Sequence, residues 1–267
     1  MSDHLSPLPS EVIRENTTVE FPLVKSSKSR IAGKLRYWWS WAVAGALMLI
    51  VAAPSLVVLK IIDRRLWLYP LAEWGAKVWL AACGADVKVT GIENLDPDRS
   101  YVFVSNHRSY LDTAALFFFS GKRMGLVAKK ELLKVPVLGW GMGFVNIIAI
   151  DRSDAEKATE SMAKARSVLE RGFSFGVFVE GTRAMPGELL PFKKGAFHLA
   201  VQTGTDIVPV AIRNTDWMMG KKEGVVYAGT VEMTLLPPIS VGGYRPGDPV
   251  TELLLAARTA IAKSLAD

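Results

Sequence analysis

The stretch that decides the fold is YVFVSNHRSYLDTAALFFF, residues 101–119. The apolar run at 101–104 predicts a buried strand, a polar turn follows it, and a helix is predicted over 112–119. A strand that leads through a polar turn into a helix is typical of α/β proteins, whose sites form where the strands end. We therefore expect chemically active side chains between residues 105 and 112.

The same alternation of strands and helices continues over residues 86–267. Further strands are predicted at 87–90, 125–128, 147–150, 175–179, 207–212, 225–228 and 231–235. Further helices are predicted at 131–144, with a break at Pro136, and at 154–170, 196–202 and 249–265. The sequence thus predicts an α/β fold, a mixed sheet covered by helices, in one domain over residues 86–267.

The N-terminal third follows another pattern. Residues 1–30 mix Pro, Ser, Asn and charged residues without apolar periodicity, which predicts a mobile tail. No charged residue lies between Tyr37 and Leu59, and as a helix this segment would cross a hydrocarbon core of ~30 Å. A second helix, 67–85, has tryptophans suited to the membrane interface. We interpret residues 31–85 as membrane-associated, either crossing the bilayer or dipping into one leaflet; a buried core helix is the alternative.

Composition limits the classes of function. The net charge of +6 and the pI near 9.4 suit an anionic bilayer surface or phosphate-bearing substrates. The globular part has no basic stripe interleaved with aromatic residues, so nucleic acid is not an expected partner. The single cysteine, Cys83, excludes an internal disulfide and favours a reducing, cytoplasm-facing site. Three scattered histidines predict no metal site.

His107 and Asp112 form the first candidate constellation. A neutral imidazole can accept a proton on one ring nitrogen while a carboxylate holds the other and fixes the tautomer. Asp112 stands five residues on, in the first turn of the predicted helix, where it could do this. No protein nucleophile is needed if the substrate brings its own hydroxyl. The alternative is structural, because Ser109 and Asp112 also have the spacing of a helix-capping box.

The second constellation is FVEGTRA, residues 178–184, which begins at the end of the predicted strand 175–179. Arg183 offers a planar fork suited to phosphate, and two lysines follow at 193–194, so the segment predicts an anion pocket. The alternative is a solvated loop in which Glu180 and Arg183 form a surface ion pair worth under ~1 kcal/mol.

Together these segments resemble the glycerolipid acyltransferases. Residues 106–112 match the NHxxxxD motif of that family, and residues 178–184 resemble its FPEGTRS motif. Two further blocks are similar, one over residues 129–139 with 150–152 and one over 207–210. The departures from the family's pattern are Val179, Ala184, Asn146 and Asp206. They stand at small or turn positions, so they affect the shape of the pocket rather than its chemistry.

The resemblance implies transfer of a fatty acyl group from acyl-CoA or acyl carrier protein to the sn-2 hydroxyl of 1-acylglycerol 3-phosphate, giving phosphatidic acid for phospholipid biosynthesis. His107 would be the general base and Asp112 the group that orients it. The residues expected to bind substrate are Asn106, Lys129, Arg152, Glu180, Gly181, Thr182 and Arg183. The expected partners are a lysophospholipid, the acyl donor and membrane lipids, with no cofactor and the active site facing the cytoplasm.

Three other functions fit these residues. The acceptor could be another lysolipid such as lyso-ornithine lipid, in which case Arg183 would have no phosphate to bind. Water could replace the alcohol, as in a thioesterase, and free fatty acid would then be the main product. A non-catalytic lipid-binding protein is the third, and the intact pair of His107 and Asp112 argues against it.

Overall fold

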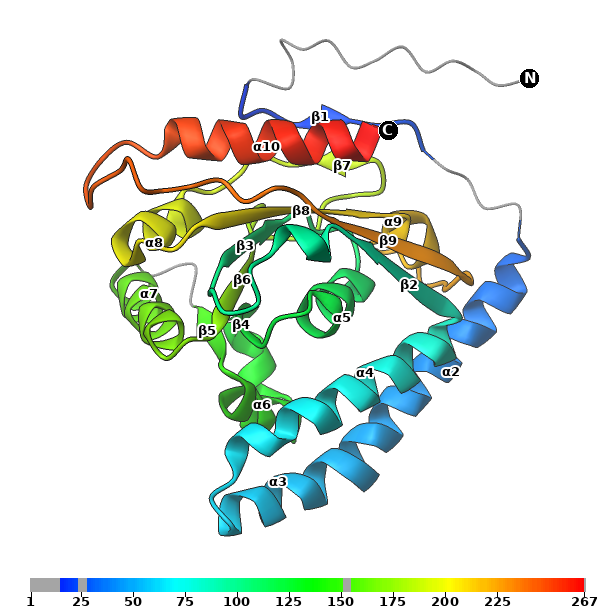
Figure 1. Cartoon of the computed structure of the whole chain (residues 1–267). Helices are drawn as coiled ribbons and strands as arrows, with labels where there is room; N and C mark the ends of the chain where they lie inside the picture. Colours follow the sequence, from blue (N-terminus) through cyan, green and yellow to red (C-terminus); the bar gives the residue numbers. More distant parts are fainter. Residues whose placement is uncertain (1–14, 24–27, 151–154, 267) are drawn as a thin grey trace.

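The computed structural model describes residues 15–23, 28–150 and 155–266. Its centre is a seven-stranded sheet in the order β2-β9-β8-β3-β6-β4-β5 (Figure 1). The strands are β2 (Ala85–Thr90), β3 (Val102–Ser105), β4 (Met124–Lys129), β5 (Ile147–Ile150), β6 (Ser174–Phe178), β8 (Ile207–Arg213) and β9 (Gly229–Leu235). Neighbouring strands are parallel except β8 and β9, which are antiparallel. The predicted mixed sheet is confirmed.

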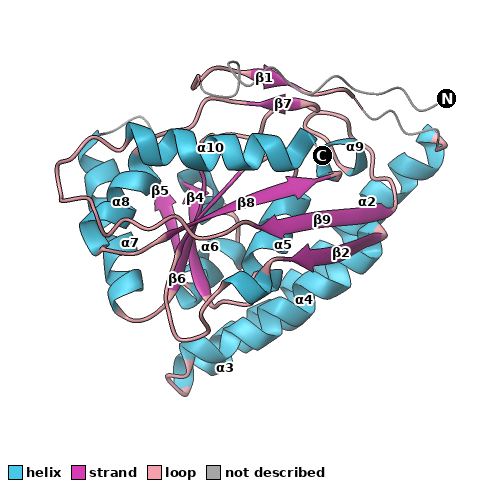
Figure 2. Cartoon of the chain, turned by 45° about the horizontal axis from the view of Figure 1, so that its top comes forward, coloured by secondary structure: helices cyan, strands magenta, loops and turns pink. Residues whose placement is uncertain are grey.

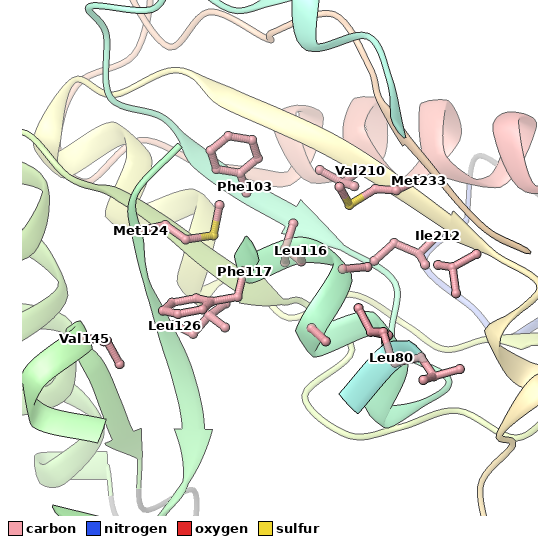
Figure 3. Packing of buried hydrophobic residues seen from close by; sticks show 14 of the residues in the cluster. Leu80, Phe103, Leu116, Phe117, Met124, Leu126, Val145, Val210, Ile212 and Met233 are labelled. Carbon is pink, nitrogen blue, oxygen red and sulfur yellow. The ribbon is translucent and has the colours of Figure 1, made fainter. Parts of the chain in front are cut away.

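Helices cover both faces of this sheet (Figures 1 and 2). One face packs against α7 (Ala155–Glu170), α8 (Gly195–Thr203) and α10 (Thr251–Ala266). The other packs against α4 (Leu68–Cys83) and α5 (Tyr110–Phe119). Under α5, the side chains of Phe103, Leu116 and Met124 meet in the core (Figure 3), and all three residues are fully buried. Burial of such a side chain stabilises the fold by about 1.5–3 kcal/mol.

The region between β4 and β5 is irregular. It contains two 3₁₀ turns, η4 (Lys130–Lys134) and η5 (Gly143–Val145), on either side of the short helix α6 (Leu138–Met142). The predicted break at Pro136 is therefore confirmed, because proline cannot donate the helical hydrogen bond.

Parallel strands bring distant turns together at one edge of the sheet. Strand β3 pairs with β6, with Ser105 opposite Phe178, and with β8, with Ser105 opposite Val210. Both turns that were expected to carry chemistry follow these strand ends directly. The polar segments 106–112 and 179–184 are adjacent for this reason, although 73 residues separate His107 from Glu180.

The N-terminal helices form a long hairpin along one side of the molecule (Figure 1). Helix α2 (Arg30–Ala46), a π-helical segment η1 (Leu47–Ala52) and α3 (Ala53–Ile61) run on continuously, and α4 returns beside α2. The wider π turn precedes Pro54, whose ring would clash with the carbonyl of a regular turn.

The outgoing arm of the hairpin is long and apolar enough to cross a membrane. Helix Arg30–Ile61 has 32 residues and a mean hydropathy of 2.5 in its most apolar window, of which only 11% is buried. A core helix of a soluble protein would be mostly buried, so that alternative is wrong. The length and the exposed apolar surface of this arm suggest membrane association.

The predicted mobile tail is wrong for residues 15–23. Strand β1 (Val19–Glu20) pairs antiparallel with β7 (Glu188–Leu189), beyond α10 (Figure 2). Arg258, fully buried in α10, donates to the carbonyls of Glu15 and Thr17. Sequence periodicity could not reveal this pairing, because two-residue strands are too short to show a pattern. Residues 1–14 lie outside the described part of the chain.

The predicted strand 225–228 is also wrong. Its first two residues, Val225 and Val226, are buried, but the backbone of this segment bonds outside the sheet. The Val226 N–H donates to the carbonyl of Gly33 in α2, and that of Tyr227 donates to Met218 in the short helix α9 (Thr215–Met218). The apolar residues therefore cover the first turns of the hairpin instead of extending the sheet.

Candidate active site

His107 and Asp112 face each other in the turn after β3. The distance from His107 Nδ1 to Asp112 Oδ2 is 3.0 Å, and the imidazole stacks on the Phe178 ring with 4.0 Å between centroids. Since an ionised carboxylate only accepts hydrogen bonds, Nδ1 carries the proton and Nε2 keeps its lone pair. The Asp112 side chain is fully buried, whereas 15% of the His107 side chain is exposed. The pair can therefore accept a proton from a molecule that reaches Nε2.

Asp112 also caps helix α5, so the predicted capping box is present beside the contact with His107. Its Oδ2 accepts the backbone N–H groups of Arg108 at 2.6 Å and Ser109 at 2.7 Å, and Ser109 Oγ accepts the N–H of Leu111 in return. Ser109 Oγ itself donates to the carbonyl of Met219. The capping box thus fixes the carboxylate in front of the imidazole, and Ser109 is already engaged in the structure of the turn.

Glu180 holds the backbone of the same turn. One carboxylate oxygen accepts the N–H of His107 at 2.6 Å, and the other accepts the N–H of Leu190 at 2.7 Å. Burial raises the pKa of Glu180 to about 7, and these two hydrogen bonds oppose the rise. Glu180 is only 3% exposed. Glu180 therefore positions the turn that carries His107.

Asn106 is likewise a structural residue. Its side-chain amide donates to the carbonyl of Ile212 and accepts the Ile212 N–H, both at 2.9 Å. The residue is fully buried, and both polar atoms of its side chain are bonded to Ile212. The paired bonds attach the turn to β8.

Arg108 was not singled out from the sequence. It is almost fully buried, its Nε donates to the carbonyl of Glu188, and its Nη1 lies 3.1 Å from Asp216 Oδ2. Its guanidinium also lies 5.2 Å from the centre of the Phe21 ring. Arg108 therefore ties the turn after β3 to β7 and to the N-terminal strand. No local pattern indicated this, because the partners lie far away in the sequence.

Arg183 lies beside the first residue of α5. Its guanidinium carbon is 3.9 Å from the centre of the Tyr110 ring. Trp41 of α2 also contacts Tyr110 in an edge arrangement, with 5.7 Å between the ring centroids. Such stacking holds a guanidinium plane while its N–H groups stay available to an anion. Lys221 Nζ donates to the carbonyl of Arg183 and fixes its backbone.

Gly181 and Thr182 form the turn before Arg183. Gly181 has a φ of 73°, and a Cβ there would lie 2.7 Å from the Lys193 side chain. The glycine thus lets Lys193 approach the turn, which brings a second cation near the anion pocket predicted around Arg183. Thr182 is exposed.

The other two predicted substrate-binding residues are placed differently. Lys129 ends β4 at the same sheet edge as His107, is 66% exposed and lies 3.3 Å from Glu131. Arg152 lies outside the described residues.

Residues 86–213 match the protein family described as acyltransferase. The chain is 41% identical over 160 residues to 1-acyl-sn-glycerol-3-phosphate acyltransferase of Saccharomyces cerevisiae, covering 59% of this chain and 52% of the yeast protein. It is 30% identical over 247 residues to the chloroplastic 1-acyl-sn-glycerol-3-phosphate acyltransferase of Arabidopsis thaliana, covering 88% of this chain and 66% of the plant protein. The chain belongs to the glycerolipid acyltransferase family. The resemblance inferred from residues 106–112 and 178–184 is confirmed.

A crystal structure from this family has the same fold. It is that of the 1-acyl-sn-glycerophosphate (LPA) acyltransferase PlsC from Thermotoga maritima, with a TM-score of 0.74 and 24% identity, covering 88% of this chain and 97% of the other. The match supports the arrangement of a helical hairpin and a mixed sheet. Our glycerolipid acyltransferase spans about half to two thirds of the length of the curated relatives described above.

Proposed function

We propose that this chain transfers a fatty acyl group from acyl-CoA or acyl carrier protein to the sn-2 hydroxyl of 1-acylglycerol 3-phosphate, giving phosphatidic acid. The observation that carries the proposal is the contact between His107 Nδ1 and Asp112, which lies just after the end of β3 and leaves 15% of the His107 side chain exposed. The relatives in yeast and Arabidopsis, named for this activity, support the choice of acceptor.

The reaction uses His107 twice. Nε2 removes the proton of the lysolipid hydroxyl as its oxygen attacks the thioester carbonyl, and a C–O bond forms. The tetrahedral intermediate then expels the thiolate, the C–S bond breaks, and the imidazolium returns its proton to sulfur. Buried Asp112 balances the charge of the imidazolium in both steps. General base catalysis of this kind contributes ~10²- to 10⁴-fold in rate.

The acceptor phosphate binds at the turn that follows β6. Arg183 supplies a fixed guanidinium plane, and Lys193 supplies a mobile charge beside Gly181. We propose that Thr182 contributes its exposed hydroxyl, that Arg152 adds a third cation, and that Lys129 stabilises the oxyanion from the end of β4. Hydrogen bonds to charged groups contribute about 1.5–3 kcal/mol each.

The helical hairpin explains how such a site meets a water-insoluble acceptor. Each buried methylene holds a lipid in the bilayer by about 0.8 kcal/mol, so a long-chain lysolipid stays in the membrane. We propose that residues 31–85 dip into one leaflet as a hairpin, because α4 returns beside α2, and that the active site faces the cytoplasm.

The test is a panel of acceptors given to the purified protein with labelled oleoyl-CoA. We expect phosphatidic acid from 1-acylglycerol 3-phosphate, and we expect Arg183→Ala to raise the KM for this acceptor about 10-fold or more while the KM for oleoyl-CoA stays unchanged. Transfer to lyso-ornithine lipid alone would reject the phosphate acceptor. Free fatty acid as the main product would show a thioesterase, and no product at all would favour a lipid-binding protein.

A further inference from the structure

The segment that runs from the last residue of β4 into the first turn of α6 has an unusual surface. We call residues 129–140 the basic–apolar loop. Four large apolar residues within it are exposed: Leu132 38%, Leu133 54%, Val135 42% and Trp140 42%. Single exposed apolar residues are ordinary, but a cluster of this kind marks a surface that binds something apolar.

The conformation of the basic–apolar loop is built into its sequence. A Cβ at Gly139 would lie 2.2 Å from the Leu133 carbonyl oxygen, so only glycine allows the chain to fold back so closely. The Gly139 N–H donates to the Val135 carbonyl at 2.9 Å. Val137 has a φ of 65°, a strained value for a β-branched residue that persists only where the surroundings impose it. The apolar side chains are therefore held outward on a defined turn.

The exposed surface of the loop continues the surface of the membrane hairpin. A Cβ at Gly141, the next glycine in α6, would lie 3.5 Å from the Leu56 side chain of α3, so the two helices pack closely. Lys60, near the end of α3, lies 5.8 Å from the centre of the Trp140 ring. Figure 1 shows α6 beside the start of α4.

The charge of the loop fits an anionic surface. Lys129, Lys130 and Lys134 border its leucines and are exposed, and Glu131 is the only acidic residue within residues 129–140. A tryptophan and lysines around exposed leucines are typical of segments that lie in the headgroup region of a bilayer. A bilayer with anionic lipids attracts each nearby lysine as well as the apolar side chains.

We infer that the basic–apolar loop is a second bilayer-contacting element, which inserts Leu132, Leu133 and Trp140 into an anionic membrane interface alongside the hairpin. The loop follows β4 and His107 follows β3, so both lie at the same end of the parallel strands. Contact of the hairpin and of the loop with the bilayer would therefore orient this end of the sheet towards the membrane. One hairpin would allow the globular part to rotate about its long axis. The second contact removes that freedom and presents the active-site edge to lipid.

The experiment uses the full chain labelled with an environment-sensitive fluorophore at one introduced cysteine. The natural Cys83 is buried, so labelling occurs at the new position. The test position is Leu133→Cys. Ile50→Cys, 74% exposed on the hairpin, is the reference for membrane insertion. Ile92→Cys is the matched control, because Ile92 is 43% exposed. It follows β2, which runs antiparallel to β8, so it lies at the end of the strands opposite to His107.

Vesicles of phosphatidylcholine and phosphatidylglycerol that carry a nitroxide quencher on the acyl chain are then added. We expect quenching at position 133 within about twofold of that at position 50, a blue shift at both positions, and no change at position 92. Quenching at 133 no stronger than at 92 would overturn the inference. A shift at 133 with acyl carrier protein but not with vesicles would assign the loop to a protein partner instead. Position 50 reports the hairpin separately, and the experiment does not depend on acyl transfer.

Discussion

Asp112→Asn separates the charge of the carboxylate from its structural bonds. Asp112 Oδ2 accepts three hydrogen bonds, from His107 Nδ1 and from the N–H groups of Arg108 and Ser109. Oδ1 is buried and has no hydrogen-bond partner within the described residues. An asparagine can therefore place its oxygen at the Oδ2 position and keep all three bonds, with its NH₂ group where Oδ1 was. The fold of the turn survives while the negative charge is lost.

The expected cost follows from the charge that develops on His107. The electrostatic attraction between an imidazolium and a carboxylate about 4 Å apart is about 4 kcal/mol at an effective dielectric constant of about 20. Removal of this gain slows the chemical step about 10³-fold. The free energy of unfolding should fall by about 1–3 kcal/mol, because one buried NH₂ group is left without a partner. The variant should therefore remain folded.

The assay is the kcat for acyl transfer to 1-acylglycerol 3-phosphate, measured beside the thermal unfolding midpoint in detergent. Asp206→Asn is the matched control, since Asp206 is also largely buried and bonded to Arg99 at 2.8 Å but precedes β8 at the opposite end of the strand. The control should lose some stability and keep its kcat. A folded Asp112→Asn variant with a kcat within tenfold of the native value would refute the role assigned to the charge.

Two further changes test the groups around the pair. Burial raises the pKa of Glu180 from about 4.5 to about 7, so the folded state binds its proton more tightly than the unfolded chain. Its contribution of about 3 kcal/mol is complete below about pH 4.5 and is lost as the pH rises through 7. Glu180→Gln should remove that slope from the free energy of unfolding measured by denaturant titration, and an unchanged slope would contradict the assignment. Tyr110→Ala should raise the KM for the phosphate acceptor about 3- to 10-fold with kcat nearly constant, because Arg183 loses the ring it stacks on. Tyr110→Phe keeps the ring and should behave as native; equal effects of the two variants would show that the hydroxyl matters instead.

The strand–turn–helix units were predictable from the sequence because their signals are local. An apolar run of strand length followed by polar residues located the ends of β3 and β6, where His107 and Glu180 lie. The pairing of His107 with Asp112 was predictable for the same reason, since the two residues span one turn and the start of a helix. The long uncharged segment likewise indicated the hairpin arm.

The roles of Asn106 and Glu180 were not predictable, because they depend on backbone groups far away in the sequence. A polar side chain within a motif looks the same whether it faces substrate or a buried N–H. Only the tertiary structure shows that Glu180 bonds to Leu190 and that Asn106 bonds to Ile212. The prediction of a strand at 225–228 failed for a related reason. The apolar residues of this segment pack under helix α2, and strand propensity alone does not distinguish such a buried segment from a strand.

The most direct test of the central claim compares native protein with His107→Ala, each given labelled oleoyl-CoA and 1-acylglycerol 3-phosphate, with the lipid products separated by chromatography. We predict labelled phosphatidic acid from the native protein and a rate lower by ~10²- to 10⁴-fold from the variant, which should still unfold in a cooperative transition. Phosphatidic acid formed by the variant at the native rate would contradict the assignment of His107 as the base.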